Sequence, residues 1–127
     1  MKCVLIIPAW SPGEIFPAGT AASQINYWQP LGVLYVGAAL LEAGHEVGFL
    51  DGSFLTHEAI LGRVGQLKPD LAGIYSTTFG WPAAARTAAG IKTLDREIWT
   101  CVGGPYPTAA RDRCLGAGGE GVDAVVV

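Results

Sequence analysis

The stretch Cys101-Val102-Gly103-Gly104-Pro105-Tyr106-Pro107-Thr108 decides how this chain of 127 residues is organised. It ends an apolar run that is typical of a buried strand, and two glycines and two prolines then stop the strand. Because glycine has no Cβ, the backbone at Gly103 and Gly104 can turn sharply and let a bulky ligand lie against it. Thr108 stands where the N-cap of a following helix is expected. The stretch therefore predicts either a ledge for a large flat ligand or an ordinary strand-to-helix turn.

Strand-like and helix-like segments alternate along the whole chain. The apolar runs that predict strands cover residues 3–7, 46–50, 71–75, 98–102 and 122–127. The segments that predict helices cover residues 31–43, 56–67, 83–94 and 108–115. Single helices between short strands imply right-handed crossovers and a parallel sheet. We therefore expect an α/β fold with a doubly wound, five-stranded parallel sheet of the flavodoxin-like or Rossmann-like type, truncated at the fifth strand.

The ends and faces of these helices carry their own signals. Pro30 is well placed at the start of the first helix, and Gly44 is a natural residue to terminate it. Thr56 is the expected N-cap of the second helix. A set of apolar residues in the first helix shares one face at helical spacing: Leu31, Leu34, Tyr35, Ala38 and Leu41.

Composition argues against several classes of protein. Half of the chain is apolar, which suffices for one domain with a sizeable core. The net charge is −3 and no basic stripe exists, so nucleic acid is not expected as a partner. No apolar run reaches the length of a membrane-spanning segment. Cys3, Cys101 and Cys114 lack the spacing of a disulfide framework or a metal site, which favours a cytoplasmic location.

Four unusual loops follow predicted strands, at residues 8–30, 51–53, 76–80 and 103–108. Ligands of doubly wound sheets bind outside the carboxyl ends of the strands, where these loops converge. The first loop is long, contains Trp10, Tyr27 and Trp28, and is either functional or partly disordered. The convergence of the four loops predicts a ligand site at this edge of the sheet.

The motifs of the common nucleotide sites are absent from the sequence. A dinucleotide site needs Gly-x-Gly-x-x-Gly directly after the first strand, where Pro8-Ala9-Trp10-Ser11 stands instead. The Gly-x-x-x-x-Gly-Lys-Ser/Thr motif of phosphate-binding loops does not occur. A phosphoacceptor receiver needs clustered carboxylates at strand ends, but Ile7-Pro8 and Ser76 occupy those places. These absences disfavour the common nucleotide ligands.

An ordered set of short motifs resembles the N-terminal cobalamin-binding domain of cobalamin-dependent radical SAM enzymes. The motifs run the length of the chain and are Leu5-Ile6-Ile7-Pro8, Gln29-Pro30-Leu31-Gly32-Val33-Leu34-Tyr35-Val36, Leu41-Glu42-Ala43-Gly44-His45-Glu46-Val47, Leu50-Asp51, Lys68-Pro69-Asp70-Leu71-Ala72-Gly73-Ile74, Ser76-Thr77-Thr78 and Val102-Gly103-Gly104-Pro105-Tyr106-Pro107-Thr108. Each motif is weak alone, whereas the ordered set is fairly specific. In this family a histidine often follows the first proline of the Gly-Gly-Pro turn, and Tyr106 takes its place here.

The resemblance implies which residues surround the cofactor. The hydroxyls and amides of residues 76–78 would meet the nucleotide tail or the corrin amides. The glycine pair would let the tail slide along the sheet edge, and the first loop would approach the corrin ring. The implied cofactor-binding residues are Pro8, Trp10, Asp51, Ser76, Thr77, Thr78, Gly103, Gly104, Pro105 and Tyr106.

The resemblance implies no residue that ligates the cobalt. Other cobalamin domains place a histidine under the cobalt through an Asp-x-His-x-x-Gly motif after the first strand, and this chain lacks that motif. His45 and His57 stand elsewhere, one after the first predicted helix and the other near the start of the second. We therefore expect a base-off cobalamin without a protein histidine ligand.

The resemblance also implies the function of a longer protein. Residues 1–127 would form the cobalamin-binding domain of a radical SAM enzyme, most often a methyltransferase that passes a methyl group from S-adenosylmethionine via methylcobalamin to its substrate. The iron–sulfur cluster, the S-adenosylmethionine and the radical SAM barrel, which is the partner of this domain, would belong to the parent chain beyond residue 127. By itself the chain would bind cofactor and turn over no substrate.

Two other functions stay open. One is a cofactor-less docking or substrate-recognition module, which Tyr106 and the missing histidine also fit. The other is a small flavodoxin-like nucleotide-binding protein. Trp28, Tyr35 and Trp81 are interpreted as core or domain-interface packing, and Asp51 as a strand-end turn residue within reach of a corrin amide.

Overall fold

The computed structural model describes residues 1–14, 17–18 and 29–127, so Tyr27 and Trp28 lie outside the described residues. The strands are β1 (Lys2–Ile7), β2 (Glu46–Asp51), β3 (Leu71–Tyr75), β4 (Trp99–Gly103) and β5 (Ala124–Val125). The α-helices are α2 (Leu31–Glu42), α3 (His57–Leu67), α4 (Trp81–Leu94) and α5 (Pro105–Ala110). The 3-10 turns in the described ranges are η1 (Pro12–Glu14), η3 (Arg111–Cys114) and η4 (Gly116–Gly118). No helix in the described ranges is long and apolar enough to cross a membrane.

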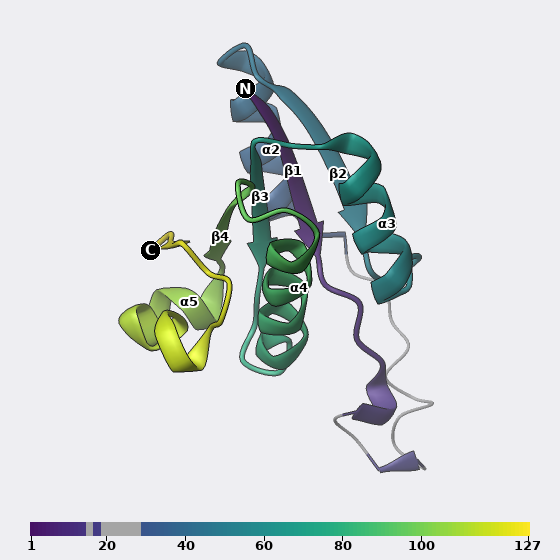
Figure 1. Ribbon diagram of the computed structural model, residues 1–127. Helices are drawn as coiled ribbons and strands as arrows, with labels where there is room; N and C mark the ends of the chain where they lie inside the picture. The colour runs from purple at the N-terminus through teal and green to yellow at the C-terminus, as the bar shows by residue number, and fades with distance from the viewer. Residues whose placement is uncertain (15–16, 19–28) are drawn as a thin grey trace.

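The five strands form one parallel sheet in the order β2-β1-β3-β4-β5, which confirms the predicted fold. Helices α3 and α4 lie on one face of the sheet and α2 lies on the other (Figure 1). The chain moves from β1 outward to β2 and then returns to β3 on the other side of β1. The point between β1 and β3 is therefore the topological switch point, where ligands of such sheets bind.

The core lies between the sheet and the α3/α4 layer. Alternate strand residues point into it, so Val4 and Ile6 of β1 are fully buried there. Ile60 and Val64 of α3 are fully buried in the same cluster. Burying each such side chain contributes about 1.5–3 kcal/mol, so this layer holds the middle of the sheet in place.

Two predicted helix ends are confirmed. The Thr56 hydroxyl accepts a hydrogen bond of 3.2 Å from the backbone N–H of Ala59 and so caps the start of α3. Gly44 follows α2 with φ +83°, a conformation that favours glycine, and its N–H donates to the Leu41 carbonyl.

Helix α2 is placed differently from what its apolar spacing suggests. The residues that share the predicted face are exposed, with Tyr35 at 81 % and Leu31 at 66 %. The helix packs on the sheet through Gly37 instead, where an added Cβ would lie 3.3 Å from the Cδ1 atom of Leu5. Because α2 is apolar on nearly every side, its pattern cannot specify which face is buried.

Helix α5 begins three residues earlier than predicted. It starts at Pro105 rather than at Thr108, and the Thr108 N–H donates to the Gly104 carbonyl as an internal helical bond. The two prolines do not stop the helix, because the first-turn N–H groups that they lack would have no partner inside the helix anyway. The helix then ends at Ala110 and continues as η3.

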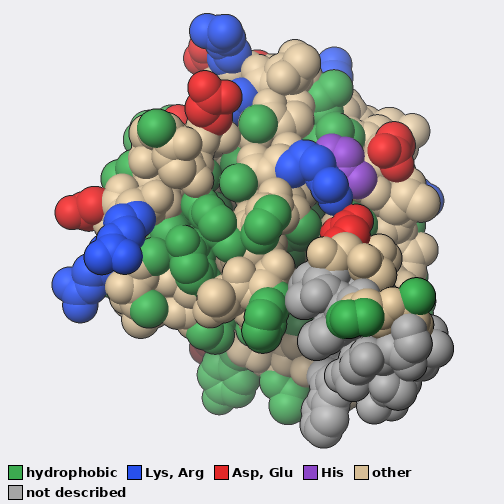
Figure 2. All heavy atoms as spheres, turned by 90° about the horizontal axis from the view of Figure 1, so that it is seen from below, with side chains coloured by type: hydrophobic (Ala, Val, Ile, Leu, Met, Phe, Trp, Pro, Cys, Tyr) green, Lys and Arg blue, Asp and Glu red, His purple; other side chains and the backbone are tan. Residues whose placement is uncertain are grey.

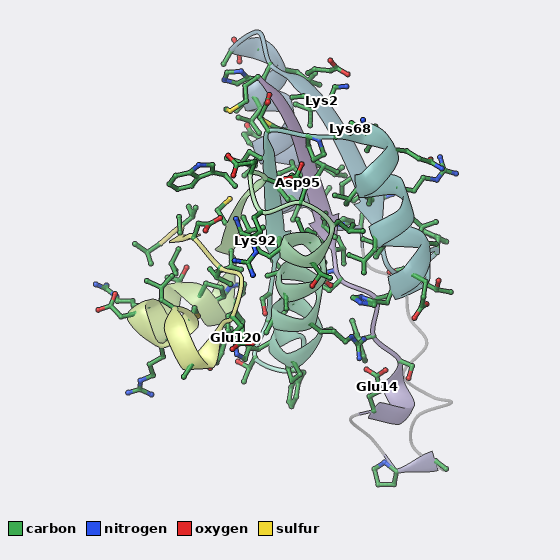
Figure 3. The ribbon with its side chains drawn as sticks, viewed as in Figure 1. Lys2, Glu14, Lys68, Lys92, Asp95 and Glu120 are labelled. Atoms are coloured by element: carbon green, nitrogen blue, oxygen red, sulfur yellow. The ribbon has the colours of Figure 1, made fainter. Side chains whose placement is uncertain are left out.

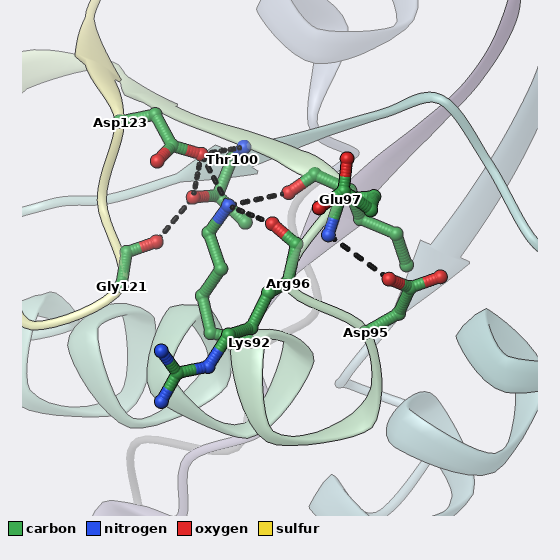
Figure 4. A network of polar contacts seen from close by, with 8 residues as sticks. Lys92, Asp95, Arg96, Glu97, Thr100, Gly121 and Asp123 are labelled. Carbon is green, nitrogen blue, oxygen red and sulfur yellow. Dashed lines mark hydrogen bonds and ion pairs between the residues drawn. The ribbon is translucent and has the colours of Figure 1, made fainter.

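A polar network attaches β5 to β4 and α4 (Figure 4). The Lys92 ammonium lies 2.6 Å from the Asp123 carboxylate, and Asp123 accepts a hydrogen bond of 2.8 Å from the Thr100 N–H. The Thr100 hydroxyl also donates to the Gly121 carbonyl. Partial burial alone would raise the pKa of Asp123, but the hydrogen bonds from Lys92 and Thr100 outweigh it and hold that pKa below its ordinary value.

Candidate cofactor site

The loops after β1 and β2 are packed against each other at the carboxyl edge of the sheet. The Gly52 N–H donates to the Ile7 carbonyl at 2.8 Å, and the Gly52 backbone approaches that of Ala9 so closely that a Cβ would not fit. Asp51 is 7 % exposed, and its carboxylate accepts a hydrogen bond of 2.8 Å from the Ser53 N–H. Asp51 is thus a strand-end turn residue, as the sequence suggests.

The loops after β3 and β4 form a second pair. The Ser76 N–H donates to the Gly103 carbonyl at 2.9 Å, and the Ser76 carbonyl accepts from the Tyr106 N–H at 3.3 Å. Gly104 has φ +107°, which a residue with a Cβ rarely adopts. The glycine pair therefore lets the β4 turn lie directly on the β3 turn.

The hydroxyl residues predicted to meet the cofactor differ in what they already bind. The Ser76 side chain is buried, and its Oγ donates to the Thr77 carbonyl at 2.9 Å. The Thr77 Oγ1 accepts a hydrogen bond of 3.1 Å from the Gly80 N–H and so orders the turn that enters α4. Thr78 is exposed at the tip of this loop. Of the three hydroxyl groups, that of Thr78 is the most accessible to a ligand.

An aromatic pair joins the β4 turn to the start of α4. The rings of Trp81 and Tyr106 lie with their centroids 5.0 Å apart and their planes tilted by 33°. Aromatic pairs in such tilted arrangements stabilise a fold beyond the area that they bury. Tyr106 is thereby a half-buried packing residue, whereas Pro105 beside it is exposed.

An apolar cleft of about 310 Å³ opens on the α2 face of the sheet at the switch point. Its floor is the sheet itself, with Gly73 of β3 between Leu5 of β1 and Cys101 of β4 in one row of the register. The side of the cleft is formed by residues of α2, among them Val33 and Val36. Gly103 and Gly104 line its end. The cleft therefore has apolar walls and a floor that lacks a side chain at its centre.

Gly73 keeps the cleft open. A Cβ at this position would lie 2.9 Å from the Cδ2 atom of Leu5 and 3.7 Å from the Cys101 sulfur. Burial raises the pKa of the Cys101 thiol, and the nearby Cys3 raises it further. The cleft was not predicted from the sequence, although a glycine inside an apolar strand is a signal for close approach of a ligand or another backbone.

The predicted site residues do not surround one cavity. Gly103 and Gly104 line the apolar cleft, whereas Trp10, which is 43 % exposed, lines a separate polar hollow beside α3. Pro8, directly after β1, is buried. Both cavities lie near the strand-end side of the molecule, where hydrophobic side chains gather in the middle and a histidine lies beside Lys or Arg side chains (Figure 2).

The two histidines lie far from each other in the fold. His45 precedes β2 at the amino edge of the sheet, and His57 begins α3 and lines the polar hollow. No group of three His, Cys, Asp or Glu side chains in the described part of the chain could hold a metal ion.

A family model described as the B12 binding domain matches residues 19–127. The chain belongs to this family. The expected cobalamin-binding domain is thereby confirmed, because B12 is cobalamin. A solved structure of a cobalamin-binding protein from Desulfitobacterium hafniense superimposes on 99 % of this B12-binding domain with a TM-score of 0.67. The domain covers 52 % of that chain and shares 16 % of its residues, so the likeness is one of fold.

Curated relatives of this B12-binding domain are much longer proteins. An uncharacterized methyltransferase of Pyrococcus horikoshii is 28 % identical over 110 residues, which are 85 % of this chain and 22 % of that protein. An anaerobic magnesium-protoporphyrin IX monomethyl ester cyclase of Synechocystis is 35 % identical over 83 residues, which are 62 % of this chain and 17 % of that protein. The chain thus spans about a fifth of these relatives.

The apolar cleft fits one part of cobalamin. The nucleotide tail of the cofactor ends in a flat, apolar aromatic base, and such groups bind in apolar pockets with a few polar groups at the rim. The cleft supplies apolar walls, while the backbone at Gly103 and Gly104 forms its rim. The residues present therefore fit the cofactor that the family binds.

Proposed function

We propose that this B12-binding domain carries base-off cobalamin, with the nucleotide tail in the apolar cleft and the corrin ring over the loops after β1, β3 and β4. The observation that carries the proposal is the glycine at the centre of the cleft floor, because any side chain at Gly73 would occupy the space of the base. A base held there cannot also ligate the cobalt.

The absence of a protein histidine ligand is part of the same proposal. The first loop bears Trp10 in place of a histidine motif. His45 lies at the wrong edge of the sheet, and His57 belongs to the polar hollow. Where imidazole is found in the described residues therefore supports a cobalt without a protein histidine ligand, whereas the base-off part of the proposal rests on the cleft.

The ten proposed contact residues divide into two groups. Gly103 and Gly104 would meet the cofactor directly because they line the cleft, and Thr78 because it is exposed in the loop after β3. The buried or internally bonded residues would act by holding the loops in shape. These are Pro8, Asp51, Ser76, Thr77 and Tyr106, whereas Trp10 and Pro105 are exposed and belong with the residues that would meet the cofactor directly.

We further propose that residues 1–127 form the cobalamin-binding part of a longer cytoplasmic radical SAM enzyme, and that this enzyme is a methyltransferase. When bound, cobalamin supplies a cobalt centre that accepts and passes on a methyl group. The chain's own residues would bind and orient the cofactor. S-adenosylmethionine, the iron–sulfur cluster and the barrel domain would belong to the rest of the parent. The names and lengths of the relatives support this, and the free thiols of the described cysteines are consistent with a reducing compartment.

Filling the cleft tests where the tail binds. Gly73→Val adds a β-branched side chain that suits a strand but occupies the cleft floor, and its Cβ would displace only the flexible end of the Leu5 side chain, which it would meet at 2.9 Å. The domain should therefore stay folded and bind hydroxocobalamin at least about tenfold more weakly. Gly62→Val is the matched control, because a Cβ at this exposed position of α3 has nothing within 4 Å. Binding is measured by visible-spectrum titration, and folding by circular dichroism.

Three results separate the possible functions. Weaker binding by Gly73→Val but not by Gly62→Val supports the tail in the cleft. Equal binding by both variants contradicts that placement. If the wild-type domain binds flavin or nucleotide instead of cobalamin, or binds no cofactor, the cobalamin-carrier function is wrong and the docking module or the nucleotide-binding protein takes its place.

A further inference from the structure

The side chains that line the apolar cleft carry few polar groups. Among the described residues that line it, Tyr75 and Cys101 are the ones whose side chains can form a hydrogen bond, and none is charged. Burial raises the pKa of the Cys101 thiol, so at neutral pH this thiol is an uncharged, weak donor. The charged residues labelled in Figure 3, such as Lys92 and Glu120, belong to other parts of the fold and do not line the cleft. The walls of the cleft therefore offer little to a polar ligand.

The backbone of the cleft floor is already paired within the sheet. The floor consists of β1, β3 and β4, and the strand order places a neighbouring strand on both sides of each of them. Gly73 lies between Leu5 and Cys101 in the parallel register, so the sheet uses its N–H and carbonyl groups. At the rim, the Gly103 carbonyl accepts a hydrogen bond of 2.9 Å from the Ser76 N–H. A polar group that rests on this floor would therefore lose its hydrogen bonds to water without replacing them.

Cofactors of the cobalamin type, the cobamides, differ in the base at the end of the nucleotide tail. Cobalamin carries dimethylbenzimidazole, a flat two-ring base with two methyl groups. Adenine has nearly the same two-ring shape, but it carries an amino group and further ring nitrogens in place of the methyl groups. The base of p-cresolyl cobamide is a cresol joined through its oxygen, so it has no free polar group. Shape therefore cannot distinguish dimethylbenzimidazole from adenine, whereas polarity can.

The cost of leaving polar groups unpaired sets the size of this discrimination. The Tyr75 hydroxyl and the weak Cys101 thiol can pair with only part of the donors and acceptors of an adenine. Each polar group left unpaired in apolar surroundings weakens binding by roughly fivefold to a hundredfold. Because the mouth of the cleft is open to water, only the groups that reach the floor lose their partners, and we count one such group.

We propose that the apolar cleft makes this B12-binding domain selective for cobamides with an apolar base, dimethylbenzimidazole or cresol, over cobamides with adenine. This inference rests on the proposed cobalamin-carrier function and on the placement of the tail in the cleft. It assigns the selectivity to the apolar wall of α2 at Val33 and Val36, together with the floor at Gly73. None of these residues is in the set of cofactor-binding residues that the sequence motifs implied.

Titration of the domain with cobalamin, p-cresolyl cobamide and the adenine cobamide tests this selectivity, with binding followed by calorimetry. The first two should bind, and the adenine cobamide should bind at least about tenfold more weakly than either. In the free cofactors adenine ligates the cobalt more weakly than dimethylbenzimidazole does. Release of the base from cobalt therefore favours the adenine cobamide and cannot produce the expected order. The cresol base does not ligate cobalt, so p-cresolyl cobamide should bind at least as tightly as cobalamin.

A polar substitution in the wall of the cleft should reduce the selectivity. Val36→Asn adds an amide with both donors and an acceptor at an exposed position of α2, so it should bind the adenine cobamide about three- to tenfold more tightly than the wild type and cobalamin more weakly. Loss of the fold would weaken both. Tyr35→Asn is the matched control, because Tyr35 is the preceding residue, is 81 % exposed and does not line the cleft, and it should bind both cofactors like the wild type.

The outcomes separate this inference from the proposed function. If the wild type binds the three cobamides equally, or Val36→Asn keeps the wild-type preference, the inference is overturned while the proposed function stands. If the wild type binds none of the three, the proposed function itself fails.

Discussion

A Cβ on Gly104 would lie 2.8 Å from the carbonyl oxygen of Ser76. This close approach is what allows the turn after β4 to rest on the turn after β3. Gly104 also has φ +107°, so both its backbone conformation and the space around it require glycine. The two turns at the proposed cofactor site therefore behave as one structural unit.

Replacing Gly104 by alanine should separate these turns. We expect Gly104→Ala to lower the free energy of unfolding by about 1–3 kcal/mol or more, because the backbone conformation becomes strained and the new Cβ meets the Ser76 carbonyl. Urea unfolding measures the change. In the matched control, Gly62→Ala adds a Cβ in open space on α3 and should stabilise the domain by about 0.5–1 kcal/mol. Equal effects of the two substitutions would contradict this role of Gly104.

Cys101 should report occupation of the apolar cleft. It lines the cleft and is half-buried, whereas Cys3 and Cys114 are at most 1 % exposed. We expect iodoacetamide to alkylate Cys101 first in the folded domain, because it is the accessible cysteine. The thiolate is the nucleophile and the pKa of Cys101 is raised, so its rate should keep rising at a pH above that at which an ordinary thiol levels off. Bound cobalamin should slow this reaction at least about tenfold. Mass spectrometry of the alkylated peptides gives the rates, and an unchanged rate at Cys101 would place the tail elsewhere.

The Tyr106 ring should matter more than its hydroxyl. Tyr106→Phe keeps the ring contact with Trp81 and should change the free energy of unfolding by less than about 0.5 kcal/mol. Tyr106→Ala removes the contact and its apolar packing and should cost about 1–3 kcal/mol. Tyr35→Ala is the control, because Tyr35 is 81 % exposed, and it should be nearly neutral. The three variants are compared by urea unfolding, and a neutral Tyr106→Ala would rule out this anchoring role.

The polar network at β5 should make the free energy of unfolding depend on pH. The pKa of Asp123 is lowered in the folded domain, so its contribution is present above the unfolded-state value of about 3.9 and is lost as the pH falls through the folded-state pKa. Asp123→Asn should therefore destabilise the domain at pH 7, by about 1–3 kcal/mol, and the difference should shrink as the pH falls through the folded-state pKa. Unfolding midpoints from pH 2 to pH 7 test this, and a constant difference across that range would contradict it.

The fold could be predicted because its signals are local. Apolar runs such as residues 71–75 are short and bounded by turn residues, so each strand can be recognised without knowing its neighbours. The orientation of α2 could not be predicted, because a helix that is apolar on nearly every side leaves the choice to packing at Gly37. The predicted start of α5 at Thr108 was wrong for a related reason. Prolines in a first turn are compatible with a helix as well as with a loop.

The candidate site could be predicted only in part. The convergence of the strand-end loops could be predicted because the carboxyl ends of parallel strands meet at one edge of the sheet. The close approach of backbone at Gly103 and Gly104 could be predicted because glycine has no side chain. Which hydroxyls already have partners depends on contacts such as that of Thr77 with Gly80, which no sequence pattern encodes. The cleft floor at Gly73 and the polar hollow at His57 depend on residues from several elements that meet only in the folded chain.

Electron paramagnetic resonance of the domain loaded with cob(II)alamin tests the central claim most directly. The unpaired electron of cob(II)alamin lies on cobalt, and a coordinated nitrogen adds a further splitting to its spectrum. We expect bound cob(II)alamin without that nitrogen splitting, because the base lies in the apolar cleft and no histidine replaces it. A bound cofactor whose spectrum retains nitrogen splitting would contradict the proposed placement of the tail, and recovery of only free cofactor would contradict the proposed function itself.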